Sequence, residues 1–309
     1  MEQRKIVAFG NSSYIISLPK RWIERNRLHK GDVLNLDEKD NEILLSLQDS
    51  AERRQFKETT IEIGSKPLPQ LKTEVISAYI NNLDIITVQG IRSEYSVKIK
   101  EMLQGLAGME VVEETATRIV VKDLLDIKEV SVENLVRRVD TIIRSMLEDL
   151  NEWNPEHYSS LVERDKEINR MVLLGYRVVR AAFDNPRVAK MFNAPYFDLL
   201  ILRQILINLE RFADEIKRIS RNSVKAKKLG DIKKLGEAIT REYYEVMKVF
   251  YSKNTEEAFR KETEIKGLFK LCDTVMEKNN TVEFAGLVEH FKYMIGAITA
   301  IVRSTLERT

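Results

Sequence analysis

Two pairs of oxygen-bearing side chains in the second half of the chain have the spacing of a cation site. Asp165 and Asn169 are four residues apart, and so are Glu210 and Asp214. Side chains at i and i+4 lie on the same face of a helix, where two like charges are mildly destabilising. A metal ion held by oxygen ligands from facing helices would offset that repulsion. The alternative is neutralisation by cationic side chains nearby, namely Arg211, Lys217 and Arg218.

A second candidate site is the basic segment at the amino terminus. Residues 3–31 contain seven lysines and arginines and one acid, Glu24, whereas residues 32–50 are predominantly acidic. Contacts from basic side chains to phosphates supply most of the affinity for DNA. The segment is therefore a candidate DNA-binding surface, and the alternative is a solvated face that pairs with the following acids. Because the whole chain has a net charge of only +2, any such surface must be local.

The composition is that of a folded protein with a sizeable core. Hydrophobic residues make up 43% of the 309 residues and charged residues 32%, which is too apolar for a disordered chain. At roughly 100–200 residues per domain, the length predicts two or three domains. The single cysteine, Cys272, cannot form an intramolecular disulfide. It lies at helical spacing from Leu268 and Val275, so we expect a buried thiol.

Enzymatic chemistry and membrane insertion have no support in the sequence. The three histidines, His29, His157 and His290, are isolated, and no phosphate-binding glycine loop or nucleophile motif occurs. Residues 1–30 lack the pattern of a signal peptide, and no stretch of about 18 uncharged apolar residues occurs. We therefore expect a cytoplasmic protein that is not an enzyme.

Three regions must position the two candidate sites. Residues 1–50 alternate short apolar runs with turns, and residues 52–128 alternate strands and helices as a small α/β module. Residues 131–309 show long runs with helical apolar spacing. The predicted helices span 131–153, 159–184, 196–222, 231–252, 255–278 and 282–308. The expected fold class is multi-domain α+β, ending in an all-α bundle of six helices packed as antiparallel neighbours.

A weak internal repeat runs through the helical region. The segments from Leu161 to Asn169 and from Ala258 to Lys266 share an apolar pair, a charged block, Glu-Ile and then a polar residue. Long predicted helices precede and follow each copy, so the economical interpretation is two copies of a three-helix unit. Ser160 and Glu163 fit a capping box that would open the helix at 159–184.

The amino-terminal segment resembles the AbrB/SpoVT family. That family combines a G-x-S turn, alternating apolar residues, an I/L-P-K sequence, a short helix and a G-D turn. The matching residues here are Gly10-Asn11-Ser12, Leu18-Pro19-Lys20, Trp22-Ile23 and Gly31-Asp32-Val33. The resemblance implies a swapped-hairpin dimer that presents basic loops to double-stranded DNA, while some members of that fold only dimerise. It would place these side chains toward phosphates: Arg4, Lys5, Lys20, Arg21 and Arg25.

The helical region resembles the PhoU family, whose bundle of two three-helix repeats carries an E/D-x-x-x-D motif. The segments from Arg164 to Arg170 and from Leu209 to Ile216 carry the resemblance. It implies a regulator of phosphate transport that communicates with a phosphate ABC transporter and binds metal clusters. A divalent or trivalent metal would then be held by Asp165, Asn169, Glu210 and Asp214.

The sequence departs from the PhoU pattern at several positions. Asn169 replaces an acid, which gives a neutral and weaker ligand. In the second repeat, the positions aligned with the four predicted ligands hold Glu262, Lys266, Ile295 and Thr299. We therefore expect at most one metal site, in the first repeat.

The two resemblances lead to one expected function and one alternative. The first is a regulator of phosphate uptake that binds DNA through its amino-terminal domain and senses phosphate status, or a partner, through its bundle. The alternative is an interaction protein that dimerises through the same domain, never contacts DNA, and regulates a phosphate ABC transporter through its ATPase subunit. In both cases we expect a homodimer or a larger assembly, because an AbrB-like half cannot close its core alone.

Overall fold

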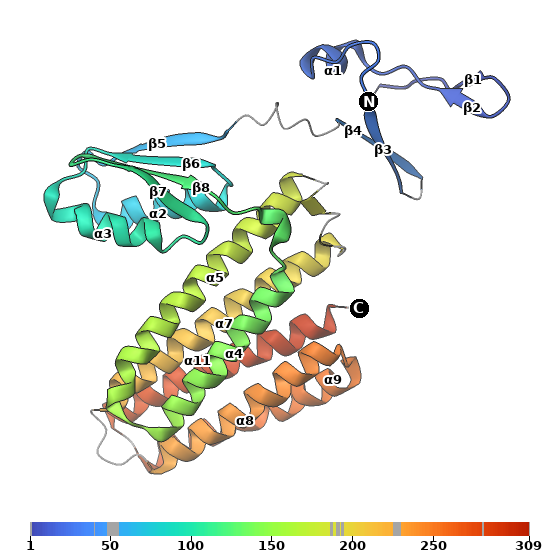
Figure 1. Cartoon of the computed structure of the whole chain (residues 1–309). Coiled ribbons are helices and arrows are strands. Elements are labelled where there is room, and N and C mark those ends of the chain that lie inside the picture. Colours follow the sequence, from blue (N-terminus) through green and yellow to red (C-terminus); the bar gives the residue numbers. More distant parts are fainter. Residues whose placement is uncertain are drawn as a thin grey trace. The chain divides into compact units, whose positions relative to one another are not determined.

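The computed structural model describes residues 2–39, 41–47, 56–185, 188–189, 192, 195–224, 230–279 and 281–308 (Figure 1). The chain forms two compact units, Met1–Gln55 and Phe56–Thr309. The boundary predicted at residues 50–52 lies outside the described residues. The fold is mixed α+β, with a small amino-terminal β region and a long carboxy-terminal helical region.

The amino-terminal unit consists of two antiparallel hairpins and one short helix. β1 (Val7–Phe9) pairs with β2 (Ser13–Ile15), and Gly10 supplies the positive φ of 70° that the connecting turn requires. α1 (Lys20–Arg25) begins directly after Pro19. β3 (Leu34–Lys39) then pairs with β4 (Glu42–Leu47). The predicted alternation of short strands and turns around one helix is confirmed for this part of the chain.

The second unit begins with a four-stranded mixed sheet that two helices cover on one face (Figure 1). Its strands are β5 (Glu58–Glu62), β6 (Ile85–Gln89), β7 (Met109–Glu114) and β8 (Arg118–Asp123), in the order β5-β6-β8-β7. The helix α2 (Leu68–Ile80) connects the parallel strands β5 and β6, and α3 (Ser93–Gln104) leads on to β7. Alternate strand residues such as Ile86, Val88 and Val121 join Val75 and Leu103 of the helices in one buried cluster.

The rest of the second unit is helical. Among the described residues its α-helices are α4 (Val132–Glu152), α5 (Tyr158–Asp184), α7 (Tyr196–Ser223), α8 (Gly230–Ser252), α9 (Thr255–Glu264), α10 (Lys266–Lys278) and α11 (Val282–Leu306). These ranges follow the predicted ones closely, except that the helix predicted at 255–278 is divided at Ile265. Glycine is a poor helix former, and Gly267 lies directly after this break.

Two corresponding turns support the internal repeat. Trp153 follows α4 and Lys253 follows α8, and both adopt a left-handed backbone, with φ of 55° and 53°. In each case an asparagine comes next, Asn154 or Asn254, and its side chain accepts a backbone N–H of the following turn at 3.0 Å. The capping box predicted at Ser160 is wrong, because the asparagine-capped turn leads directly into α5 two residues earlier, at Tyr158.

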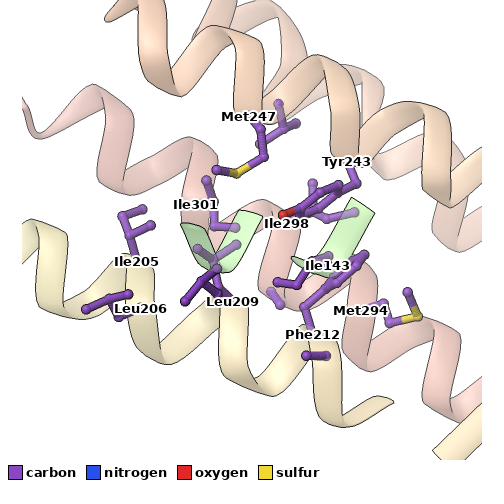
Figure 2. Packing of buried hydrophobic residues seen from close by; sticks show 14 of the residues in the cluster. Ile143, Ile205, Leu206, Leu209, Phe212, Tyr243, Met247, Met294, Ile298 and Ile301 are labelled. Carbon is purple, nitrogen blue, oxygen red and sulfur yellow. The ribbon is translucent and has the colours of Figure 1, made fainter. Parts of the chain in front are cut away.

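The bundle core combines side chains from several helices (Figure 2). Leu209 and Phe212 of α7 meet Ile298 of α11 and Tyr243 of α8, and the rings of Phe212 and Tyr243 stack with centroids 4.6 Å apart. In the described part of the chain, α11 alone is long and apolar enough to cross a membrane, and half of its apolar stretch is buried inside the protein. That burial is what a core helix of the bundle requires.

A buried ion pair joins the sheet to the bundle. The Arg177 side chain on α5 is 1% exposed and donates from Nη1 to Asp123 Oδ1 at 3.1 Å, at the end of β8. Its Nε donates to Asn82 Oδ1 at 3.3 Å, and its guanidinium lies 4.7 Å from the centre of the Tyr79 ring. The α/β module and the helices therefore keep separate hydrophobic clusters but share one compact unit.

Replacement of Arg177 tests how strongly this pair holds the unit together. Removing one partner of a buried ion pair leaves an uncompensated charge, so Arg177→Met should lower the free energy of unfolding by about 3–5 kcal/mol. The measurement is urea unfolding of the full chain followed by circular dichroism. Arg180→Met is the matched control, because Arg180 forms an exposed pair with Asp184 on the same helix. It should change stability by less than about 1 kcal/mol. Equal losses in the two variants would contradict the interpretation.

Candidate functional site

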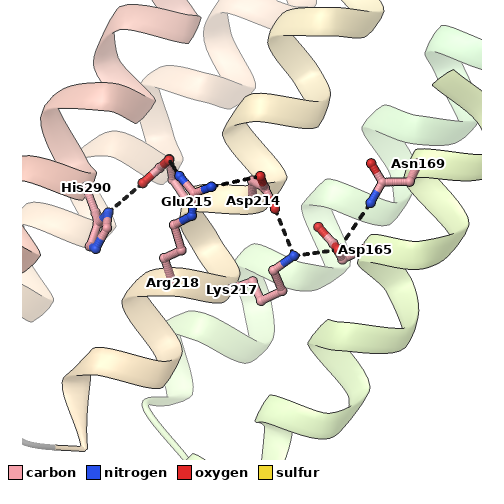
Figure 3. A network of polar contacts seen from close by, with 7 residues as sticks. All are labelled: Asp165, Asn169, Asp214, Glu215, Lys217, Arg218 and His290. Carbon is pink, nitrogen blue, oxygen red and sulfur yellow. Dashed lines mark hydrogen bonds and ion pairs between the residues drawn. The ribbon is translucent and has the colours of Figure 1, made fainter. Parts of the chain in front are cut away.

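The acidic residues predicted to bind metal lie along the seam between α5 and α7, where Figure 3 shows Asp165 and Asp214. Lys217 lies between two of them, with Nζ 2.6 Å from Asp165 Oδ2 and 2.8 Å from Asp214 Oδ1. Asn169 donates its side-chain amide to the same Asp165 oxygen at 3.3 Å. The Asp165 side chain is only 8% exposed and that of Lys217 is 23% exposed. The cation in contact with both aspartates is therefore a lysine of the chain itself.

A network of polar contacts continues from this cluster to α11 (Figure 3). Arg218 donates to Asp214 Oδ2 at 3.1 Å and also pairs with Glu215. Glu215 Oε2 lies 2.6 Å from His290 Nδ1, and Asn222 Nδ2 lies 3.0 Å from the other ring nitrogen. These partners satisfy the buried Glu215 carboxylate, which would otherwise be strongly destabilising. Ion pairs and hydrogen bonds thus link α5, α7 and α11.

The electrostatics of the cluster follow from burial and crowding of acids. Burial raises the pKa of Glu210, and repulsion from Asp214 and Asp165 raises it further. Burial also raises the pKa of Asp165, against the opposing effect of Lys217. Burial alone would lower the pKa of Lys217, but its hydrogen bonds to the two aspartates raise it. The lysine therefore keeps its charge, and the acids are the groups under electrostatic strain.

The side-chain atoms at this seam are placed to bind a lysine rather than a divalent or trivalent metal. One oxygen of each aspartate is already bound by Lys217, and Asn169 presents its NH₂ group rather than its carbonyl oxygen. In the described ranges, no group of three or more histidine, cysteine, aspartate or glutamate side chains is placed to hold a metal ion. The metal stays a prediction, and the contacts at the seam are those of an ion-pair cluster.

The aligned positions of the second repeat have other partners. Ile295 is fully buried in the core, and Thr299 donates its hydroxyl to the Ile295 carbonyl at 2.8 Å. Glu262 on α9 accepts from Arg303 Nε on α11 at 2.9 Å. A cationic side chain therefore joins the second and third helices of this repeat as well.

In the amino-terminal unit, the apolar side chains face outward. Among the residues of 2–47 whose burial is described, none is buried. Val7, Phe9 and Tyr14 are 59%, 65% and 76% exposed. Isolated two-stranded hairpins are marginally stable in water, and exposed apolar patches mark interaction surfaces. This unit therefore needs another surface to cover it.

The five basic residues predicted to contact DNA are exposed. Lys20 lies 3.7 Å from Glu24 with 90% of its side chain exposed, and Arg4 pairs with the neighbouring Glu2. Exposed pairs of this kind contribute little free energy, so both cations remain available to an anionic partner. The other three have no ion-pair partner within the described part of the chain: Lys5, Arg21 and Arg25.

Comparison with known families identifies the amino-terminal unit. The model of the family described as "Antidote-toxin recognition MazE, bacterial antitoxin" matches residues 7–52. The match covers both hairpins and α1, and it supports the AbrB-like domain predicted from the residues there. Self-association is consistent with such a domain. No curated protein matches the chain.

Sequence reasoning missed two members of the polar network. Glu215 and His290 are 75 residues apart, and their contact depends on how α7 and α11 are rotated against each other. In the sequence His290 is isolated, because its nearest neighbours offer no metal-ligand spacing. The sequence offers Lys217 as a neutralising side chain, but it does not reveal that Lys217 lies between acids from two helices.

The thiol of the only cysteine has low reactivity in this fold. Cys272 is buried, as predicted, and burial raises the pKa of its thiol to about 11. The thiolate is the reactive form, so on the order of 0.1% of the native thiol is ionised at pH 8. A nucleophilic role for Cys272 therefore has no structural support.

Thiol labelling checks this assignment. At pH 8, DTNB should react with the native protein at least about 100-fold more slowly than with protein unfolded in guanidinium chloride, where the thiol pKa returns to about 8.5. The rate is read from the absorbance of the released thiolate. Comparable rates in the two states would mean that Cys272 is accessible and ionisable.

Proposed function

We propose that this chain is a homodimeric, cytoplasmic regulator of phosphate uptake that binds double-stranded DNA through its AbrB-like unit. The observation that carries the proposal is the surface of that unit. Apolar side chains are exposed on two short hairpins, and basic side chains lie in the same unit without strong ion-pair partners.

Dimerisation and DNA binding support each other in this proposal. Covering apolar surface contributes about 25 cal/mol per Å², and a second copy of the chain offers the same surface for a self-complementary pairing. The pairing also doubles the number of basic side chains presented to one duplex. Each phosphate that they neutralise adds about 0.9 to the slope of log affinity against log salt.

The helical region is assigned the phosphate-related part of the function. Support comes from the PhoU-like segments around Asp165 and Glu210 and from the corresponding turns at Asn154 and Asn254. In this role the bundle responds to phosphate status or binds a partner, for which the ATPase subunit of a phosphate ABC transporter is the candidate.

A second candidate function omits DNA. The exposed hairpins by themselves require only a partner copy, so the AbrB-like unit acts as a dimeriser and the bundle regulates the transporter. The basic residues distinguish the two functions, because DNA binding requires them and dimerisation alone does not.

Charge reversal on α1 tests the DNA-binding proposal. The variant Lys20→Glu with Arg21→Glu should weaken binding of the full chain to duplex DNA at least about tenfold at low salt, because it replaces phosphate contacts with repulsion. The slope of log affinity against log salt should decrease in magnitude by about 2–4. Fluorescence anisotropy at several KCl concentrations measures both quantities.

The matched control carries the same charge change in the other unit. Lys233→Glu with Lys234→Glu alters two exposed residues of α8 and should leave affinity within about twofold. If both variants lose affinity equally, net charge alone explains binding. If the unmodified chain shows no affinity at low salt, the DNA proposal fails and the second function stands.

The dimer is tested by the cross-strand pair Val7 and Ile15. The full chain should scatter light as a particle of at least twice 35.9 kDa, and Val7→Asp with Ile15→Asp should dissociate it, because two charges would enter a covered apolar surface. Val282→Asp is the control, since Val282 is 86% exposed on α11 and should leave the mass unchanged. A monomeric unmodified chain at micromolar concentration would contradict the proposal.

A further inference from the structure

We propose that the Lys217 ammonium group is the cation that neutralises the acids at the seam between α5 and α7, and that it takes the place of a bound metal ion there. The seam comprises Asp165 and Asn169 on α5 and Glu210, Asp214 and Lys217 on α7, and Figure 3 shows all of these except Glu210. The ammonium group bridges the helices through contacts of 2.6 Å to Asp165 and 2.8 Å to Asp214. No added metal is then needed to hold these two helices together.

The contacts around Lys217 leave little room for a multivalent metal cation. Arg218 takes the other oxygen of Asp214 at 3.1 Å, so both oxygens of that carboxylate already face cationic groups. A divalent ion placed between the aspartates would meet an ammonium and a guanidinium at close range. Like charges this close repel each other strongly in a partly buried site, and the charge of +2 on the ion doubles the effect of each contact. The lysine and a metal therefore exclude each other.

The second repeat contains a related ion pair one position further along its third helix, where Val302 stands opposite Lys217. In the alignment that places Glu262 opposite Asp165 and Thr299 opposite Asp214, Arg303 stands opposite Arg218. Arg303 on α11 donates to Glu262 on α9 at 2.9 Å. Both three-helix repeats thus join their second and third helices with a basic side chain of the third helix and an acid of the second.

Of the two bridges, the one between Lys217 and Asp165 matters more for stability, because it is the more deeply buried. Asp165 is almost completely buried and its Oδ1 has no hydrogen-bond partner in the described structure, whereas Arg303 is largely exposed. If the ammonium is removed, the buried Asp165 carboxylate has only Asn169 as a partner, beside two further acids. The variant protein should then gain an affinity for divalent cations that the natural chain lacks.

The experiment compares full-length variants with and without MnCl₂. Lys217→Met should lower the melting temperature by about 5–10 °C, and Mn²⁺ should recover at least half of that loss while one ion per chain is retained on gel filtration. The natural chain should retain no Mn²⁺ and melt at the same temperature in Mn²⁺ and in EDTA. Lys166→Met, in an exposed pair with Glu163 on α5, should behave like the natural chain.

Two further variants keep the proposal testable if Lys217→Met does not fold. Lys217→Arg should stay stable and insensitive to Mn²⁺, because it keeps the charge. Asp165→Asn with Lys217→Met should recover most of the lost stability without Mn²⁺, because the unpaired acid is gone. Stoichiometric Mn²⁺ on the natural chain, lost with Asp165→Asn, would overturn the proposal. So would a Lys217→Met protein that is destabilised but unaffected by Mn²⁺, or a double variant that remains unstable.

Discussion

The constraint on which the rest of the molecule depends is that none of the residues of the amino-terminal unit whose burial is described is buried. Its strands of three to six residues carry apolar side chains, such as Phe9 and Tyr14, that remain exposed in a single chain. Such hairpins cannot offset the loss of conformational entropy on folding unless another surface covers them. The stability of this unit therefore depends on the surface that covers its apolar side chains.

The second unit has a different requirement. It contains two hydrophobic cores, and these must be held together. Hydrophobic contact alone permits sliding, whereas the Arg177 guanidinium must meet Asp123, Asn82 and the Tyr79 ring at fixed distances. A charge that is 1% exposed has no alternative partner in water, so the contact specifies one geometry. The sheet and α5 are consequently joined by directional polar contacts as well as by apolar packing.

The sequence predicted elements far better than it predicted pairings. The helices α4, α5, α7, α8 and α11 lie within a few residues of their predicted ends, because long apolar stripes are local signals. The break at Ile265 and the caps at Asn154 and Asn254 were missed, since they depend on single residues. The positions of Lys217 and Arg177 could not be predicted, because which cation meets which acid depends on the rotation and spacing of separate elements.

The two units therefore respond to different variables. A seam held by a metal is sensitive to metal supply, since binding stabilises the folded state in proportion to the logarithm of ligand concentration. At a seam held by Lys217 the cation is part of the polypeptide. The stability of such a seam therefore does not vary with metal concentration. The amino-terminal unit, in contrast, leaves its apolar side chains exposed, so its stability depends on the surface that covers them. In the dimer proposed above, the pairing of two chains is the variable step, whereas a seam held by Lys217 keeps its cation at any metal concentration.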